Sequence, residues 1–219
     1  MKIGITGANG FIGKHLTDAL EDPIIFHGDL NETDDVRKFV LDCDRIYHLA
    51  GKNRADTGEI LKNNVVSTAN LILSMKLENK YPELIFASSQ QIIWNADSEY
   101  GFTKALEEEI VKKANRWCIY RIPNVYGPDG KPFYNSVVAT FCYQISNGEK
   151  VTINDPNAQR EFIYIDDLIQ YLLNPEFSTY KSPNGELLTI GEIYSFLTDR
   201  VGEHKKLKMC LEYYKKEVD

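Results

Sequence analysis

The 219-residue sequence contains no run of about 18 apolar residues, the length that spans a bilayer as a helix. It also lacks a basic excess, because 25 Lys and Arg stand against 32 Asp and Glu and the formal net charge is −7. Extended contact with nucleic acid or with anionic membranes is therefore not expected. No secretory signal is recognisable either, so we expect a cytoplasmic protein.

Residues that ligate metals are few and scattered. The four cysteines form no C-x-x-C pair, and the four histidines are far apart in the sequence. This spacing predicts no metal site and favours reduced thiols that serve packing. Internal repeats and flexible linkers are lacking as well, whereas 43% hydrophobic residues suffice for a buried core.

A glycine-rich stretch at residues 7–13 follows a short apolar strand and precedes a helical pattern. In such a loop one glycine permits a tight turn, the next lets backbone approach a pyrophosphate, and the third lets helix pack on strand. The helix start adds free N–H groups and the positive end of its dipole. The spacing is G-x-x-G-x-x-G, so the motif alone is weak, but its flanking elements favour a dinucleotide site.

Strand and helix patterns alternate through the first half of the chain. Five apolar strands are predicted, at residues 1–6, 24–27, 45–49, 84–88 and 117–121. Such alternation favours right-handed crossovers and a parallel sheet with helices on both faces. We therefore predict an α/β fold, a Rossmann-type doubly wound sheet, with residues 1–121 as the dinucleotide-binding core.

Prolines and glycines interrupt this alternation from Pro123 onward. Later elements are predicted as helices at residues 135–146, 190–197 and 205–216 and short strands at 151–153 and 162–165. We interpret residues 122–219 as a small C-terminal substrate-binding cap that is interleaved with the core. Residues 162–173 are expected to return to the sheet.

Tyr100 and Lys104 stand four residues apart in a helical pattern and so share one helix face. A nearby ammonium favours tyrosinate, which suits the phenol for proton exchange near neutral pH. Ser88 and Ser89 follow the fourth strand, at the sheet edge where open α/β sheets bind ligands. Each feature alone is common in proteins, so only their combination indicates a catalytic site.

The order of these motifs resembles the extended, sugar-nucleotide branch of the short-chain dehydrogenase/reductase superfamily, the NAD-dependent epimerase/dehydratase family. The resemblance rests on the glycine loop, residues 48–51, Asn64, Ser89, Tyr100 with Lys104, and residues 121–128 and 160–168. It runs from residue 1 to about residue 173. It implies that a dinucleotide contacts Gly7, Asn9, Gly10, Phe11, Ile12, Gly13, Asp29, Leu30, Leu49, Ala50, Gly51, Asn64, Tyr100 and Lys104.

The resemblance also implies roles in catalysis. Ser89 would polarise the substrate oxygen, Tyr100 would act as general acid/base, and Lys104 would lower the pKa of Tyr100 and hold the nicotinamide ribose. The implied substrate-binding residues are Ser89, Gln90, Asn124, Asn135 and Arg160. Relatives often dimerise through two long helices, which implies a homodimer, although the apolar stripes of residues 64–79 and 100–113 would equally suit packing on the sheet.

Residues 48–54 and 131–143 resemble more closely the N-terminal reductase domain of bacterial capsular-polysaccharide enzymes. Those enzymes reduce a UDP-linked 4-keto-6-deoxy amino sugar, and full-length members carry a second, cupin-type domain. The implied function is a 4-keto-6-deoxy-sugar-nucleotide reductase of cell-surface polysaccharide biosynthesis, acting on a UDP- or dTDP-linked sugar. The sequence does not distinguish a natural short form from a chain that lacks the second domain.

Two other functions remain open, a sugar-nucleotide 4-epimerase with the same three catalytic residues and a non-catalytic dinucleotide-binding regulator. A dehydratase is disfavoured, because Gln90 and Gln91 stand where dehydratases carry an acidic pair, and glutamine exchanges no proton.

The cofactor is expected to be NAD or NADP. Asp29 lies about 20 residues after the glycine loop, where an acid bonds the ribose 2′-hydroxyl of NAD. In the alternative interpretation, Asp29 is the aspartate that contacts adenine in relatives. Because no cluster of cations suggests a clamp for the 2′-phosphate of NADP, we favour NAD.

Overall fold

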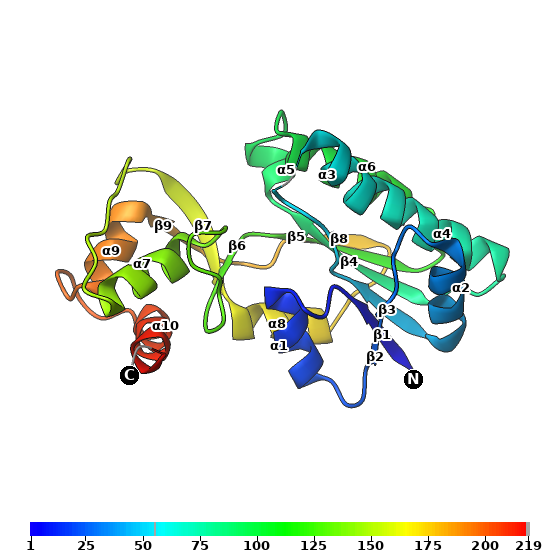
Figure 1. Ribbon diagram of the computed structural model, residues 1–219, viewed down its shortest axis with the longest axis horizontal. Helices are drawn as coiled ribbons and strands as arrows, with labels where there is room; N and C mark the ends of the chain where they lie inside the picture. The colour runs from blue at the N-terminus through cyan, green and yellow to red at the C-terminus, as the bar shows by residue number, and fades with distance from the viewer. Residues whose placement is uncertain (55, 218–219) are drawn as a thin grey trace. The chain divides into compact units, whose positions relative to one another are not determined.

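The protein, described by a computed structural model for residues 1–54 and 56–217, divides into two compact units (Figure 1). Unit 1 comprises Met1–Ile122 and Tyr171–Ser182, and unit 2 comprises Pro123–Gln170 and Pro183–Asp219. Each unit therefore contains two separate stretches of the chain. The sequence-based boundary after Arg121 lies one residue before the division after Ile122.

Unit 1 is built on a six-stranded parallel sheet in the order β2-β1-β3-β4-β5-β8. The strands are β1 (Ile3–Thr6), β2 (Ile24–Ile25), β3 (Arg45–His48), β4 (Glu83–Ser89), β5 (Trp117–Ile122) and β8 (Thr179–Lys181). The pairing of β4 with β5 runs from Leu84↔Trp117 to Ser89↔Ile122. Ser89 therefore stands at the carboxyl edge of the sheet, where ligands of such folds bind.

Helices cover both faces of this sheet (Figure 1). They are α1 (Phe11–Ala19), α2 (Thr33–Asp42), α3 (Thr57–Leu61), the π-helical segment η1 (Lys62–Val66), α4 (Ser67–Leu77), α5 (Gln91–Trp94) and α6 (Glu99–Val111). One face buries Ile46, Phe86 and Ile119 against α2, α4 and α6. On the other face, Tyr47 and Tyr120 donate hydrogen bonds to the end of α8 (Ile165–Leu173). The predicted doubly wound α/β fold is confirmed.

Unit 2 contains a three-stranded sheet of β6 (Asn124–Tyr126), β7 (Gln159–Tyr164) and β9 (Glu186–Thr189). Strand β7 is parallel to β6 and antiparallel to β9. Helices α7 (Val137–Ser146), α9 (Ile190–Leu197) and α10 (Lys205–Lys216) complete the unit. Side chains cap the N-termini of two of these helices. Ser136 accepts a hydrogen bond from Ala139 N–H at the start of α7, and Thr189 forms a capping box with Glu192 at the start of α9.

The expected path of the C-terminal half needs correction. Residues 162–164 do not return to the large sheet but pair with β6 and β9 in the small one. The strand that extends the large sheet is β8. Within residues 162–173, the carbonyls of Tyr171 and Leu172 accept hydrogen bonds from tyrosines of that sheet. No strand forms at residues 151–153, all of which the structure describes. Strands β6 and β8 have three residues each, which is too short for an alternating pattern to stand out.

Candidate active site

The glycine loop lies where three backbone segments approach each other closely. Gly7 has φ +76°, and a Cβ placed on it would lie 2.6 Å from the backbone nitrogen of Ala50. A Cβ on Gly13 would lie 2.1 Å from the carbonyl oxygen of Gly7. Any side chain at either position would thus push α1 or the loop after β3 away from β1. These two glycines let β1, α1 and the loop after β3 pack backbone against backbone, and we call the turn between β1 and α1 the backbone cradle.

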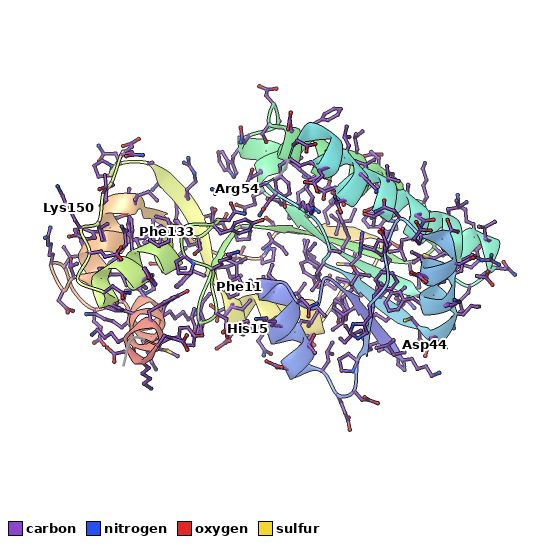
Figure 2. The ribbon with its side chains drawn as sticks, viewed as in Figure 1. Phe11, His15, Asp44, Arg54, Phe133 and Lys150 are labelled. Carbon is purple, nitrogen blue, oxygen red and sulfur yellow. The ribbon has the colours of Figure 1, made fainter. Side chains whose placement is uncertain are left out.

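Helix α1 turns its N-terminus toward this cradle. Its first backbone hydrogen bond runs from Lys14 N to Gly10 O, so the N–H groups of Phe11, Ile12 and Gly13 precede that bond. The ring of Phe11 packs edge-on against His15 one turn later, with 5.4 Å between ring centres (Figure 2). The helix start therefore offers backbone donors and the positive end of the helix dipole.

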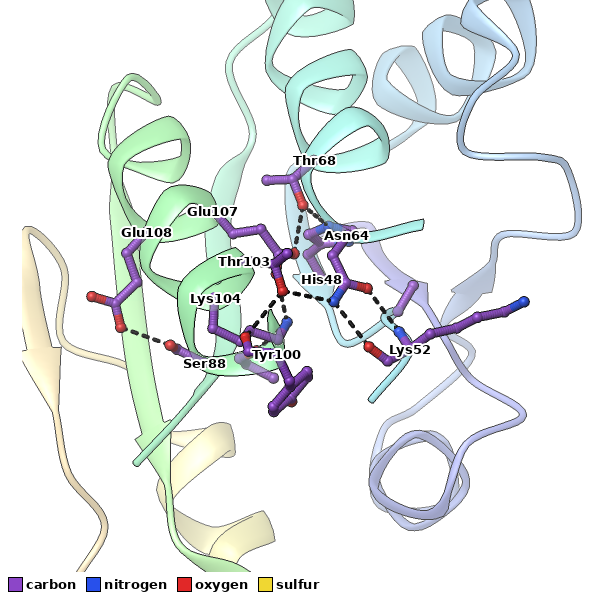
Figure 3. A network of polar contacts seen from close by, with 12 residues as sticks. His48, Lys52, Asn64, Thr68, Ser88, Tyr100, Thr103, Lys104, Glu107 and Glu108 are labelled. Carbon is purple, nitrogen blue, oxygen red and sulfur yellow. Dashed lines mark hydrogen bonds and ion pairs between the residues drawn. The ribbon is translucent and has the colours of Figure 1, made fainter. Parts of the chain in front are cut away.

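Asn64 fastens the loop that follows β3. Its side chain is fully buried in the π-helical segment, accepts from Lys52 N at 2.8 Å and donates to Lys52 O at 2.9 Å. The same amide donates to Thr103 Oγ1 at 3.3 Å, and the Thr103 hydroxyl donates to the Tyr100 carbonyl (Figure 3). Asn64 therefore connects the loop after Gly51 with helix α6, and short π-helical segments frequently mark functional sites.

Tyr100 and Lys104 share the face of α6 that lies over the carboxyl end of β4. Lys104 is 3% exposed, and its Nζ donates to the carbonyl of Ala87 at 3.3 Å and lies 5.9 Å from the ring centre of Tyr100. A Cβ on Gly51 would lie 3.4 Å from Lys104 Nζ and 3.4 Å from Asn64 Oδ1. The structure thus brings the predicted residues Gly51, Asn64, Tyr100 and Lys104 together.

The protonation states of this pair follow from burial and charge. Burial raises the pKa of the Tyr100 phenol, and the Lys104 ammonium opposes that shift only in part. Lys104 therefore acts in the predicted direction, but the net pKa of Tyr100 in the free protein is raised rather than lowered. Burial also lowers the pKa of Lys104, but Glu107, Tyr100 and Glu108 together more than offset this, with Glu107 foremost, so the pKa of Lys104 is raised. Near neutral pH the pair is a neutral phenol beside an ammonium.

The two serines at the end of β4 have different partners. Ser88 is buried, and its hydroxyl donates to Glu108 Oε1 at 2.6 Å (Figure 3). Successive strand residues point to opposite faces, so the Ser89 side chain is directed away from Glu108. The hydroxyl oxygen of Ser89 accepts from Gln91 N at 3.2 Å, and Gln90 is nearly buried and donates to Ser182 Oγ. Ser88 is committed to packing, which leaves Ser89 as the candidate for chemistry.

Three predicted substrate-binding residues meet in unit 2. Asn124, Asn135 and Arg160 line one pocket, with Phe162 and Ile190 among its apolar walls. The Asn124 amide donates to Glu161 O at 3.0 Å across β6 and β7, and Arg160 donates to the carbonyl of Gln159 at 2.7 Å. A guanidinium beside two amides suits recognition of a polar anionic ligand.

Residues 3–174 match the model of the NAD dependent epimerase/dehydratase family. The chain belongs to this family. It is 33% identical over 180 residues to UDP-2-acetamido-2,6-beta-L-arabino-hexul-4-ose reductase of Pseudomonas aeruginosa, with 78% of this chain covered. The match covers 48% of that relative, so the chain spans about half of its length.

Two solved structures of similar fold extend the comparison. The capsular polysaccharide assembling protein CapF from Staphylococcus aureus has a TM-score of 0.79 and 29% identity, covering 100% of this chain and 67% of CapF. UDP-glucose 4-epimerase from Thermotoga maritima has a TM-score of 0.84 at 19% identity, covering 100% of both chains, which shows the shared fold. The predicted family resemblance is confirmed.

Members of the NAD dependent epimerase/dehydratase family need a dinucleotide site, and the residues of this chain fit one. The cradle at Gly7 and Gly13 has no room for side chains, and the first N–H groups of α1 precede its first hydrogen bond. These features suit a pyrophosphate.

Asp29 and Leu30 follow β2, which pairs directly with β1. The Asp29 carboxylate accepts two hydrogen bonds of 2.9 Å from Asn31, and these lower its pKa. The Leu30 carbonyl accepts from Asn70 on α4 at 2.8 Å. An ionised carboxylate therefore follows the strand beside β1.

Within residues 1–54 and 56–217, no cluster of three or more His, Cys, Asp or Glu side chains suits a metal ion. In the same part of the chain, no helix has the length and apolar character needed to cross a membrane.

Glu107 is the site residue that sequence reasoning missed. It is fully buried, and its carboxylate lies 3.1 Å from Lys104 Nζ. Its position three residues after Lys104 in a helix was the available signal. However, the run of three glutamates from 107 to 109 has the composition of a solvated helix face.

Proposed function

We propose that the chain is an NAD(P)-dependent oxidoreductase that reduces a nucleotide-linked 4-keto-6-deoxy sugar for cell-surface polysaccharide biosynthesis. The observation that supports this function most strongly is a protonated Tyr100 beside a charged Lys104, next to Gly51 and the backbone cradle. The 33% identity to a relative named as a hexul-4-ose reductase supports a keto sugar as substrate.

Ser89, Tyr100 and Lys104 would provide the acid/base chemistry. The bound reduced nicotinamide supplies the hydride for the sugar carbonyl. The Ser89 hydroxyl donates a hydrogen bond to the carbonyl oxygen, and the Tyr100 phenol donates the proton that converts the oxygen into a hydroxyl group. The Lys104 ammonium stabilises the resulting tyrosinate until solvent returns the proton. A phenol that is protonated at neutral pH suits the direction of reduction.

Asn124, Asn135 and Arg160 would hold the nucleotide part of a UDP- or dTDP-linked sugar. A guanidinium binds diphosphate oxygens through paired, charge-assisted hydrogen bonds, and the two amides supply both donors and acceptors. Their common pocket in unit 2 supports this assignment. Ser89 and Gln90 would contact the sugar.

The decisive assay follows oxidation of NADH or NADPH with a panel of UDP- and dTDP-linked 4-keto-6-deoxy sugars. With cofactor deuterated at the transferred position, the reductase assignment predicts one deuterium in the product sugar for each dinucleotide oxidised. An isomeric product without net oxidation of added dinucleotide would instead identify a 4-epimerase. Tight dinucleotide binding without turnover of any substrate in the panel would indicate a regulator.

We also propose a homodimer formed through α4 and α6. The stripe of Leu71, Ile72, Met75 and Val111 packs against the sheet. Other apolar side chains on this helix pair are exposed, namely Leu73, Leu77, Phe102 and Leu106. Leu73→Glu should shift the solution mass from dimer to monomer, whereas Leu41→Glu, at an exposed position on α2, should not. A monomeric wild-type protein at micromolar concentration would contradict the proposal.

A further inference from the structure

Glu107 is a buried carboxylate that lies one helical turn after Lys104. Its side chain is fully buried, and its Oε2 lies 3.1 Å from the similarly buried Lys104 Nζ. Burying two charges is costly and is tolerated only where the geometry is good and the remaining lone pairs are hydrogen-bonded. The partners of the second oxygen, Oε1, therefore decide what this pair can do.

A directed chain of hydrogen bonds ends at Glu107 Oε1 (Figure 3). The Thr68 hydroxyl donates to Oε1 at 2.9 Å. Because Thr68 has a single hydroxyl hydrogen, the 2.9 Å contact with His48 requires His48 Nε2 to be the donor. His48 Nδ1 then accepts from the Thr6 hydroxyl at 2.7 Å. Burial lowers the pKa of His48 to about 3, which is consistent with this neutral tautomer.

The chain begins at the backbone cradle. Thr6 Oγ1 accepts from the N–H of Ala50, at 3.4 Å, and Ala50 is the residue that a Cβ on Gly7 would strike. Thr6, His48 and Thr68 are each fully buried, so water does not compete for these hydrogen bonds. Every donor points toward Glu107, and aligned hydrogen bonds polarise one another. Burial raises the pKa of the Glu107 carboxyl, and the Lys104 ammonium and the Thr68 hydrogen bond both oppose that rise.

Lys104 meets few other charges. From α6 it faces Glu107, Tyr100 and, at longer range, Glu108. From β4 it faces the ring of Phe86, with Nζ 4.6 Å from the ring centre, and the carbonyl of Ala87. From β3 it faces neutral His48. Glu107 is thus the carboxylate in contact with the Lys104 ammonium.

We propose that Glu107, held by Thr68 and His48, is a positioning residue that keeps the Lys104 ammonium charged and fixed beside Tyr100. This inference rests on the proposed function, in which Lys104 stabilises the tyrosinate. Glu107 touches neither substrate nor dinucleotide in this account and acts only through Lys104. The chain from Thr6 ties that action to the loop beside the cradle.

The first test measures the charge of Lys104 directly, without turnover. NMR titration of isotope-labelled lysines in the dinucleotide-free protein, with the Lys104 signal assigned from Lys104→Met, reports its proton affinity. Glu107→Gln keeps an acceptor for Thr68 but removes the charge, so Lys104 should lose at least about tenfold in proton affinity, a pKa decrease of one unit. The control is Glu109→Gln, which removes an exposed carboxylate of the same helix that pairs with Lys112. It should leave the pKa of Lys104 unchanged.

The second test uses the pH profile of turnover. In Glu107→Gln, kcat should fall at alkaline pH at least about one pH unit earlier than in the wild type, matching the Lys104 titration, while KM changes little. Thr68→Val removes the hydrogen-bond donor to Glu107 but keeps the carboxylate. It should also lower the pKa of Lys104, but by less than Glu107→Gln does. This variant carries the test if Glu107→Gln does not fold.

An unchanged Lys104 titration in Glu107→Gln, or in Thr68→Val if only that variant folds, would overturn the inference. A shifted Lys104 titration in a protein that turns over no keto-sugar nucleotide would have a different meaning. It would refute the proposed reductase while leaving the coupling of Glu107 to Lys104 established.

Discussion

The hydroxyl of buried Ser88 donates a 2.6 Å hydrogen bond to Glu108, whose carboxylate also accepts two hydrogen bonds from Arg121. Because of this contact, the two adjacent serines have different roles. Ser88 ties β4 to α6 and to β5, whereas Ser89 remains as the candidate hydrogen-bond donor to substrate. The pair therefore provides a matched comparison.

Ser89→Ala should lower kcat by about 10²- to 10³-fold, the usual effect of removing one hydrogen bond to a reacting oxygen. Ser88→Ala should leave kcat within about twofold but lower the free energy of unfolding by about 2 kcal/mol, because a buried hydrogen bond to a charged acceptor is lost. Steady-state kinetics and urea unfolding measure the two effects. An inactive Ser88→Ala with an active Ser89→Ala would reverse the assignment.

Gly13→Ala should weaken dinucleotide binding by at least about 100-fold, because the added Cβ meets the Gly7 carbonyl and separates α1 from β1. Gly58→Ala is the matched control, since its Cβ would make only an ordinary 3.4 Å contact. Calorimetric titration with NAD and NADP measures both variants. Retention of wild-type affinity in Gly13→Ala would show that the dinucleotide does not use this cradle.

NAD should bind at least about tenfold more tightly than NADP, because the Asp29 carboxylate would repel a 2′-phosphate and bond a 2′-hydroxyl. The lowered pKa of Asp29 keeps this group ionised at neutral pH. Asp29→Asn should narrow the difference in affinity, because it weakens the binding of NAD and leaves the binding of NADP unchanged. Tighter binding of NADP by the wild-type protein would assign Asp29 to another role.

Arg160→Met should weaken binding of UDP- or dTDP-sugars by about 10- to 100-fold, as expected for loss of a charged hydrogen-bond donor to a diphosphate. Binding of the dinucleotide should stay unchanged, because Arg160 lies in the pocket of unit 2. Lys150→Gln, at an exposed position of the same unit, is the control for net charge. Equal losses in both variants would indicate general electrostatics rather than a specific contact.

Protonation of His48 should make stability depend on pH. Its pKa falls from 6.5 to about 3 in the folded protein, so the unfolded chain binds more protons between these values. The free energy of unfolding should therefore decrease as pH falls from 6.5 toward 3, with an upper limit of about 5 kcal/mol from this residue. Urea unfolding of the wild type and of His48→Gln at several pH values isolates the contribution of His48 to the pH dependence of the free energy of unfolding. Parallel pH dependence in both proteins would contradict it.

Local spacing made part of the site predictable. The distance between Tyr100 and Lys104 is one helical turn, and the glycines of residues 7–13 form a continuous segment, so both features appear in short stretches of sequence. The joint pocket of Asn124, Asn135 and Arg160 was not deducible from spacing, because β6 and β7 pair across a long segment. It followed only from family resemblance.

Contacts between distant segments explain most of what was missed. Thr68 and His48 are 20 residues apart, and Thr68 and Glu107 are 39 apart, so no local pattern indicates that they join. Ser89 was chosen over Ser88 from the family resemblance alone. The contacts that distinguish the two serines involve Glu108 and Arg121, which α6 and β5 bring to one face of β4.

The most direct test of the central claim is the rate of keto-sugar reduction by Tyr100→Phe, measured beside its affinity for the dinucleotide. We expect the affinity for the dinucleotide to stay within about threefold of wild type, because the ring and its packing are kept. We expect kcat to fall by about 10²- to 10⁴-fold, because the proton donor is lost. Near wild-type reduction of a confirmed substrate by Tyr100→Phe would show that Tyr100 is not the proton donor.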